Sequence, residues 1–171
     1  MQFLNPAEIL ELLPLKPTMK AADLGCGSGG WTIPLAKKLS AGKVWAVDIL
    51  EEPLSSLRSK KKLFGLSNIE TIKANIEEKI PLPPESCDLV LLVNVLFQNE
   101  EIEKIIKEAT RILKNGGFLL IADWNQKLSS DHLLISSEKV KEIAKNFPLK
   151  REREIDWGPY HYVIIYKKDA K

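Results

Sequence analysis

The chain has 171 residues, of which 44% are hydrophobic and 28% are charged, and its formal net charge is +2. These values are ordinary for one soluble globular domain covering residues 1–171, and so small a basic excess does not indicate a nucleic-acid partner. No apolar stretch approaches the roughly 20 residues that span a bilayer, and Glu8 and Glu11 interrupt the apolar run that a signal peptide needs. We therefore expect a cytoplasmic protein without a membrane partner.

Short apolar runs alternate with stretches of helical periodicity along the chain. Near-continuous apolar runs are typical of parallel strands that are buried on both faces. The elements predicted in chain order are a short helix at about residues 5–13, strand Lys20–Leu24, helix Trp31–Leu39, strand Lys43–Asp48, helix Pro53–Phe64, strands Ile69–Lys73 and Cys87–Val93, helix Glu100–Leu113, strand Phe118–Asp123 and helix Glu138–Asn146.

Two of these helices carry recognisable end signals. Asn99 is predicted to cap the helix over Glu100–Leu113, and Asn115-Gly116-Gly117 to end it. Ser137 is predicted to cap the last helix.

The end of the chain has a different pattern. Lys150–Asp156 and Tyr160–Lys168 are strand-like and are joined by Trp157-Gly158-Pro159, which predicts a hairpin. The fold class that follows is α/β: a Rossmann-like, doubly wound sheet of seven strands, mostly parallel with an antiparallel last strand.

The densest chemical signal is a glycine-rich run after the first predicted strand. Gly25-Cys26-Gly27-Ser28-Gly29-Gly30 opens a helix, and such glycines let the backbone turn tightly and approach a ligand. Asp48 ends the next strand, 21 residues after Gly27, where a carboxylate can accept hydrogen bonds from two ribose hydroxyls. Together they predict an adenosine-binding site.

Two classes of cofactor compete for this site. The glycine run satisfies G-x-G-x-x-G, the dinucleotide fingerprint. Asp23, two residues before the first glycine, favours the other class, because a carboxylate suits the amino end of S-adenosylmethionine and would repel a pyrophosphate. A nicotinamide enzyme would also need a second half or a substrate domain. We therefore predict S-adenosylmethionine, with S-adenosylhomocysteine as its product.

Asp23-Leu24-Gly25-Cys26-Gly27-Ser28-Gly29 resembles the first motif of class I S-adenosylmethionine-dependent methyltransferases. Val44–Asp48 resembles their second motif, and Cys87–Val95 their fourth strand. Arg111–Gly117 is similar to the family's R-x-L-K-P-G-G run, with Asn115 in place of the proline. Within the family, the closest likeness is to the broad subgroup containing ubiquinone- and menaquinone-biosynthesis methyltransferases.

The resemblance implies a role for each matching position. Asp23 and the backbone of Gly25 and Gly27 would hold the methionine end of the cofactor. Asp48 would bind the ribose, Ile49 would pack on the adenine, and Asn75 would face the adenine amino group, although that position is more often Asp. The residues implied in cofactor binding are Asp23, Leu24, Gly25, Cys26, Gly27, Gly29, Trp31, Asp48, Ile49, Asn75, Ile76, Asn94 and Val95.

The methyl acceptor is less well indicated. The fourth strand is followed by Asn94-Val95-Leu96-Phe97 instead of the Asp-Pro-Pro-Tyr or Asn-Pro-Pro-Tyr run of nucleic-acid amino-methylating relatives, which favours a small molecule. A protein or RNA substrate and a non-catalytic, cofactor-binding partner domain stay open as alternatives. If a general base is used, Asp123 and His132 are the candidates, since both follow the fifth strand.

Other features bound the site. Cys26 and Cys87 are too few and too far apart to predict a metal site. About 19 residues precede the first predicted strand and about 14 separate the fifth strand from the last helix, so no separate lid domain is expected. The pocket is then open, completed by a second subunit in a homodimer, or adapted to a bulky acceptor.

Overall fold

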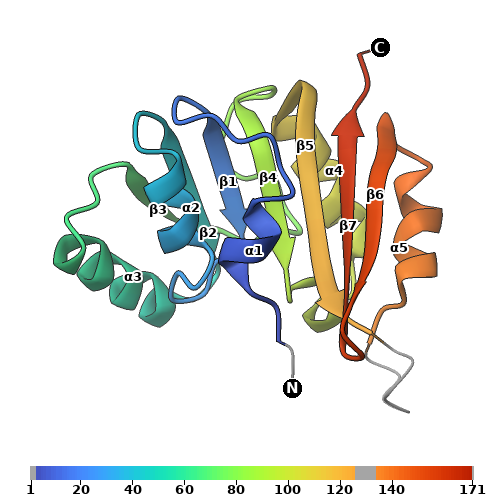
Figure 1. Cartoon of the computed structure of the whole chain (residues 1–171), viewed down its shortest axis with the longest axis horizontal. Helices are drawn as coiled ribbons and strands as arrows, with labels where there is room; N and C mark the ends of the chain where they lie inside the picture. The colour runs from blue at the N-terminus through green and yellow to red at the C-terminus, as the bar shows by residue number, and fades with distance from the viewer. Residues whose placement is uncertain (1–2, 126–133, 171) are drawn as a thin grey trace.

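The structure is a computed structural model, and it describes residues 3–125 and 134–170. A seven-stranded sheet runs through the molecule in the order β3-β2-β1-β4-β5-β7-β6 (Figure 1). Its strands are β1 (Lys20–Leu24), β2 (Lys43–Asp48), β3 (Ile69–Lys73), β4 (Cys87–Val93), β5 (Leu113–Trp124), β6 (Leu149–Trp157) and β7 (His161–Lys168).

The sheet confirms the predicted fold class. Parallel pairing joins β1 with β2 and β4, β2 with β3, and β4 with β5. Only β7 runs against its neighbours β5 and β6, so the final hairpin supplies the one antiparallel strand of the described sheet. The carboxyl ends of the parallel strands therefore meet at one edge of the sheet, where ligands bind in open α/β folds.

Helices cover both faces of the sheet (Figure 1). On one face α1 (Pro6–Leu10), α2 (Thr32–Lys38) and α3 (Glu51–Leu63) pack over a buried cluster that includes Leu35, Val44 and Leu91. On the other face α4 (Ile102–Ile112) and α5 (Ser137–Ala144) pack over a second cluster. Apolar burial of this kind, on both faces, explains why the central strands are apolar at almost every position.

The predicted ends of the fourth helix are wrong. The side chain of Asn99 donates to the carbonyl of Val95 at 2.6 Å, so it closes the turn before the helix instead of capping it. The helix begins at Ile102. At its other end Leu113 already pairs with Cys87, and β5 continues through Asn115-Gly116-Gly117, so this run belongs to a strand that contains an irregularity.

Smaller corrections concern the other helices. The cap of α5 is Ser136, whose hydroxyl accepts from the Lys139 amide at 3.2 Å, and not Ser137. The first helix ends at Leu10, short of the predicted end. Residues 74–86 connect β3 to β4 without a helix. Among the described residues, no helix is long and apolar enough to cross a membrane.

Candidate cofactor-binding site

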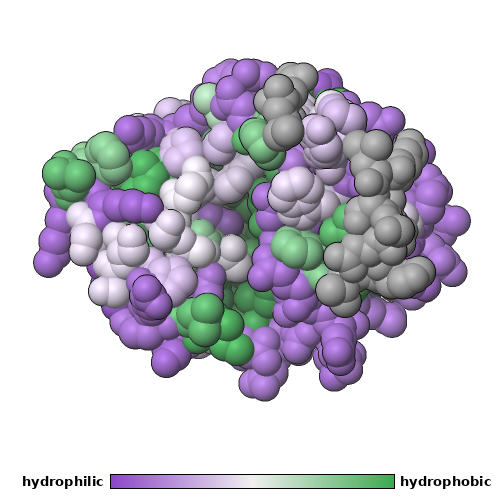
Figure 2. Space-filling model, turned by 90° about the horizontal axis from the view of Figure 1, so that it is seen from below, coloured by the Kyte–Doolittle hydropathy of each residue, from purple (hydrophilic) through white to green (hydrophobic). Residues whose placement is uncertain are grey.

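A cavity of about 290 Å³ opens at the edge where the parallel strands end. Figure 2 looks onto this edge and shows a hollow near the middle of the face, with apolar residues visible inside it and hydrophilic residues around it. The cavity is lined by residues that follow β1, β2, β3 and β4: Gly25, Asp48, Ile49, Leu50, Pro53, Ala74, Asn75, Ile76, Asn94, Val95, Gln98 and Asn99.

The glycine-rich loop after β1 is held against the end of β2. The backbone amides of Gly25 and Cys26 both donate to the carbonyl of Val47, at 2.8 and 3.0 Å. The amide of Gly27 donates to Oδ2 of Asp48 at 2.8 Å. These amides already have acceptors. A ligand that approaches the backbone of this loop closely would therefore meet its carbonyl oxygens more than free N–H donors.

Asp48 is fixed at the mouth of the cavity by two backbone amides. Besides the Gly27 contact, its Oδ1 accepts from the amide of Leu50 at 3.0 Å. A carboxylate oxygen can accept more than one hydrogen bond, so lone pairs stay available for ribose hydroxyls. Ile49 and Leu50 beside it are 55% and 60% exposed, and this apolar surface suits a planar base.

Asn75 faces the same cavity from the segment that follows β3. Its Oδ1 accepts from the Glu77 amide at 3.0 Å, which fixes the orientation of the side-chain amide. The second lone pair of that oxygen stays free for an amino group. Ile76 is buried beside it and lines the cavity.

Asp23 lies just below the glycine loop at the end of β1. Its side chain is almost fully buried, and its Oδ2 accepts from the Thr32 hydroxyl at 2.6 Å. Burial raises the pKa of this carboxyl to about 6, against the hydrogen bond from Thr32, and the negative charge of Asp48 raises it further. A buried carboxyl with a raised pKa is one that a cationic ligand would bind as the carboxylate.

Asn94 carries an unpaired polar atom at the end of β4. Its φ of 52° is in the left-handed region, which Asn tolerates better than most residues. Its Oδ1 is buried and has no hydrogen-bond partner among the described residues. Such an orphan acceptor in a cavity wall is the kind of group that a bound ligand satisfies. Val95, the next residue, packs so close to Gly25 that a Cβ added to the glycine would lie 2.3 Å from Cγ2 of Val95.

Asp123, one of the two general-base candidates, accepts hydrogen bonds from backbone amides through both of its carboxylate oxygens. The residue is completely buried, and its Oδ2 accepts from the amides of Leu96 and Phe97 at 2.9 and 3.4 Å. Its Oδ1 accepts from the Trp124 amide at 2.8 Å. Burial raises the pKa of Asp123 to about 6, although these hydrogen bonds lower it. The carboxyl thus holds the turn after β4. His132, the other candidate, lies outside the described residues.

Six of the sequence-predicted residues do not line the cavity: Asp23, Leu24, Cys26, Gly27, Gly29 and Trp31. Leu24 and Cys26 are buried, and burial raises the pKa of the Cys26 thiol far above its usual range. Trp31 packs against the cluster that includes Leu35. A Cβ at Gly29 would lie 2.4 Å from Leu57, so this glycine lets α3 approach the loop. Sequence reasoning missed five lining residues: Leu50, Pro53, Ala74, Gln98 and Asn99.

Comparison with known proteins agrees with this fold. The family described as "Methyltransferase domain" matches residues 22–121. Demethylmenaquinone methyltransferase of Bacillus cytotoxicus is 31% identical over 120 residues, which is 70% of this chain and 50% of that protein. The chain therefore spans about half the length of the curated relatives it matches.

Solved structures agree over nearly the whole chain. A SAM-dependent methyltransferase from Aquifex aeolicus superposes with a TM-score of 0.87 at 27% identity, covering 96% of this chain and 89% of that one. The [4+2]-cyclase SpnF has a TM-score of 0.86 at 14% identity, covering 97% and 80%, and at that identity the likeness concerns the fold alone.

The fold places a cavity at the carboxyl edge of a doubly wound sheet, where ligands bind in open α/β folds. With the family match over residues 22–121, the chain belongs to the class I S-adenosylmethionine-dependent methyltransferases.

Proposed function

We propose that this chain transfers a methyl group from S-adenosylmethionine to a small-molecule acceptor of the quinone type. The observation that carries the proposal is the convergence of Asp48, Asn75 and Asn94 on one cavity beside a buried carboxyl, Asp23. The named relatives, demethylmenaquinone methyltransferases, support the acceptor class.

The residues present fit the cofactor. Asp23 would bind the ammonium group as a carboxylate, and Asp48 would accept from the ribose hydroxyls. Asn94 has a buried acceptor without a partner, which the methionine part of the ligand would satisfy. When bound, S-adenosylmethionine supplies a methyl group that is already activated, so the protein's main task is to align the reactants.

An aromatic pair at the same edge supports a planar acceptor. The rings of Trp124 and His161 lie 4.2 Å apart, at the end of β5 and the start of β7. Burial lowers the pKa of His161, so its imidazole is neutral at pH 7, and its Nδ1 is buried without a partner. Trp124 is half-buried whereas His161 is buried, so Trp124 is the ring of this pair on which a flat acceptor could stack.

The test uses S-adenosylmethionine labelled in its methyl group. The purified protein is incubated with demethylmenaquinone, and separately with RNA and with total protein from a cell extract. Label on the quinone alone is the expected result. Label on RNA or protein would overturn the acceptor class, and no label anywhere, with normal cofactor binding, would indicate a binding-only domain.

Cofactor affinity should fall about tenfold between pH 7 and pH 5, because Asp23 must lose its proton before it can pair with the ammonium group. Its pKa of about 6 in the free protein places the change in this window, with full affinity above it. Calorimetry with S-adenosylhomocysteine measures the change. Asp23→Asn should remove the pH dependence, and 5′-methylthioadenosine, which lacks the ammonium group, should not show it. A flat profile for the normal protein would contradict the assignment of Asp23.

We further propose that Asp123 positions the turn after β4 and is not a general base. Asp123→Asn should therefore keep kcat within about tenfold of the normal value, whereas loss of a general base costs roughly 100- to 10,000-fold. Single-turnover methyl transfer measures this, with urea unfolding as the control for the altered hydrogen bonds. A loss of 100-fold or more in a folded variant would restore Asp123 as the base.

A further inference from the structure

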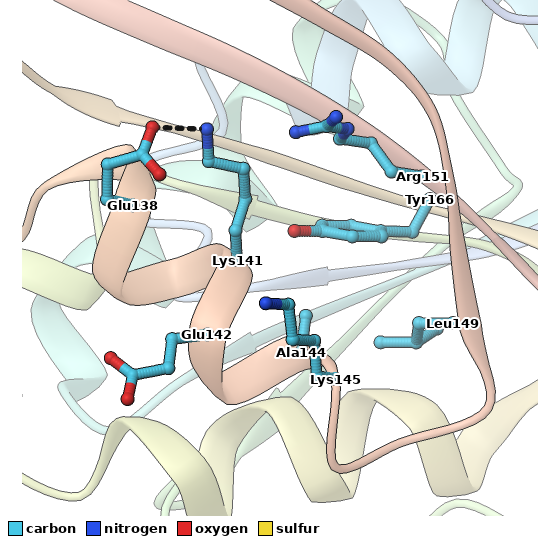
Figure 3. A pocket seen from close by; sticks show the side chains of 8 residues that line it. All are labelled: Glu138, Lys141, Glu142, Ala144, Lys145, Leu149, Arg151 and Tyr166. Atoms are coloured by element: carbon cyan, nitrogen blue, oxygen red, sulfur yellow. Dashed lines mark hydrogen bonds and ion pairs between the residues drawn. The ribbon is translucent and has the colours of Figure 1, made fainter.

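A second cavity, of about 600 Å³, lies between α5 and the strands β6 and β7 (Figure 3). It shares no lining residue with the cofactor cavity. It lies on the sheet face that α4 and α5 cover, beside the edge strand β6, at the opposite end of the strand order from β2 and β3. The proposed methyl transfer makes no use of it.

A buried hydroxyl without a partner points into this cavity. The side chain of Tyr166, on β7, is only 3% exposed, and its hydroxyl oxygen makes no hydrogen bond to residues 3–125 or 134–170. In Figure 3 the hydroxyl is directed from the strand toward α5, into the space between them. Leaving a hydroxyl buried and unpaired is unfavourable, so a ligand that accepts this hydrogen bond would recover part of that cost.

Two cations with free donors face the same space. The side chain of Lys145, directly after α5, has no ion pair or hydrogen bond within the described part of the chain. Arg151 pairs with Tyr166 in the sheet register, and within the described residues its one side-chain hydrogen bond runs from Nη1 to Glu154 at 2.7 Å. In the view of Figure 3 the charged ends of Arg151 and Lys145 lie above and below the Tyr166 hydroxyl.

A third cation, Lys141, is already paired with carboxylates. It contacts Glu138 and donates to both carboxylate oxygens of Glu154, at 2.9 and 3.2 Å. This network ties α5 to β6 and neutralises Lys141. Glu154 also accepts from Nη1 of Arg151, so the donors left for a ligand are Lys145, the Tyr166 hydroxyl and the other nitrogens of Arg151.

We infer that this cavity binds the phosphate group of a small phosphate monoester. Three donors, from the end of α5, from β6 and from β7, approach from different directions, which suits the three terminal oxygens of a phosphate better than the two of a carboxylate. Glu138 and Glu142 stand at the mouth, with side chains 82% and 71% exposed, and their charge disfavours polyphosphates and nucleic acids. The inference does not depend on the proposed methyl transfer.

The test is a titration of the whole chain with inorganic phosphate, in the presence of saturating S-adenosylhomocysteine so that the cofactor cavity is blocked. We expect saturable binding, with amide chemical-shift changes in nuclear magnetic resonance spectra centred on Tyr166, Arg151 and Lys145. Tyr166→Phe and Lys145→Ala should each weaken the binding about tenfold, because each removes a hydrogen bond to a charged group. Acetate should bind at least tenfold more weakly than phosphate.

Lys139→Ala is the matched control, since Lys139 is an exposed lysine of α5 that does not line the cavity. It should leave phosphate binding unchanged. Tyr166→Phe keeps the ring and removes only an unpaired hydroxyl, so it should fold normally, which urea unfolding checks. Equal phosphate affinity in the normal protein, Tyr166→Phe and Lys145→Ala, shifts confined to other surfaces, or no saturable binding would each overturn the inference.

Discussion

Replacing Gly25 by alanine should lower the free energy of unfolding by roughly 2–5 kcal/mol. The left-handed backbone of this residue, with a φ of 76°, costs an alanine about 1–2 kcal/mol. A Cβ there would also lie 2.3 Å from Cγ2 of Val95, and overpacking of this kind adds about 1–3 kcal/mol. Because a domain of this size has only about 5–15 kcal/mol of stability, urea unfolding would detect the change readily.

Two variants separate the cost of the left-handed backbone at Gly25 from the cost of its close contact with Val95. Gly30→Ala is the control, because Gly30 has no left-handed φ and a Cβ added to it would meet nothing within 4 Å. It should change the free energy of unfolding by less than about 1 kcal/mol. The double variant Gly25→Ala/Val95→Ala, compared with Val95→Ala alone, should show the backbone strain without the crowding. Equal stability of Gly25→Ala and Gly30→Ala would contradict the close contact between the two loops.

The central sheet was predictable from the sequence because its strands are buried on both faces. The predicted bounds of β1, β2, β3 and β4 match the structure, even for the edge strand β3, in which only Ile69 is buried. Helix ends were less predictable. Asn99 has the chemistry of a cap, yet its amide closes a different turn, onto Val95, and tertiary contacts of this kind leave no local signal.

The site was predictable in part for a similar reason. Gly25, Asp48 and Asn94 lie at or directly after strand ends, so topology alone brings them to one edge. Gln98 and Asn99 line the cavity from the turn after β4, whose path depends on two backbone hydrogen bonds to the buried Asp123 carboxylate. The cavity beside Tyr166 depends on how α5 packs against the hairpin, which no sequence spacing indicates.

Asp48→Ala should weaken the binding of S-adenosylhomocysteine by roughly 10- to 150-fold, because it removes the charge-assisted hydrogen bonds proposed for the ribose hydroxyls. Calorimetry at pH 7 measures the change. Asp48→Asn keeps one acceptor oxygen without the charge, so its affinity should fall between those of the alanine variant and the normal protein. The alanine variant also loses the acceptors for the Gly27 and Leu50 amides, so its stability must be measured beside its affinity.

Glu52→Ala supplies the matched control for charge. Glu52 is an exposed acidic residue in the first turn of α3, close in sequence to the cavity but not part of its lining. If the loss of affinity came from a change in the electrostatic field at this edge of the sheet, both Asp48→Ala and Glu52→Ala would show it. If it comes from direct contact with the ribose, only the Asp48 variants will. Unchanged affinity in a folded Asp48→Ala protein would refute the assignment of Asp48 to the ribose. Tight binding of a nicotinamide dinucleotide would instead contradict the choice of cofactor, because Asp23 would then face a pyrophosphate.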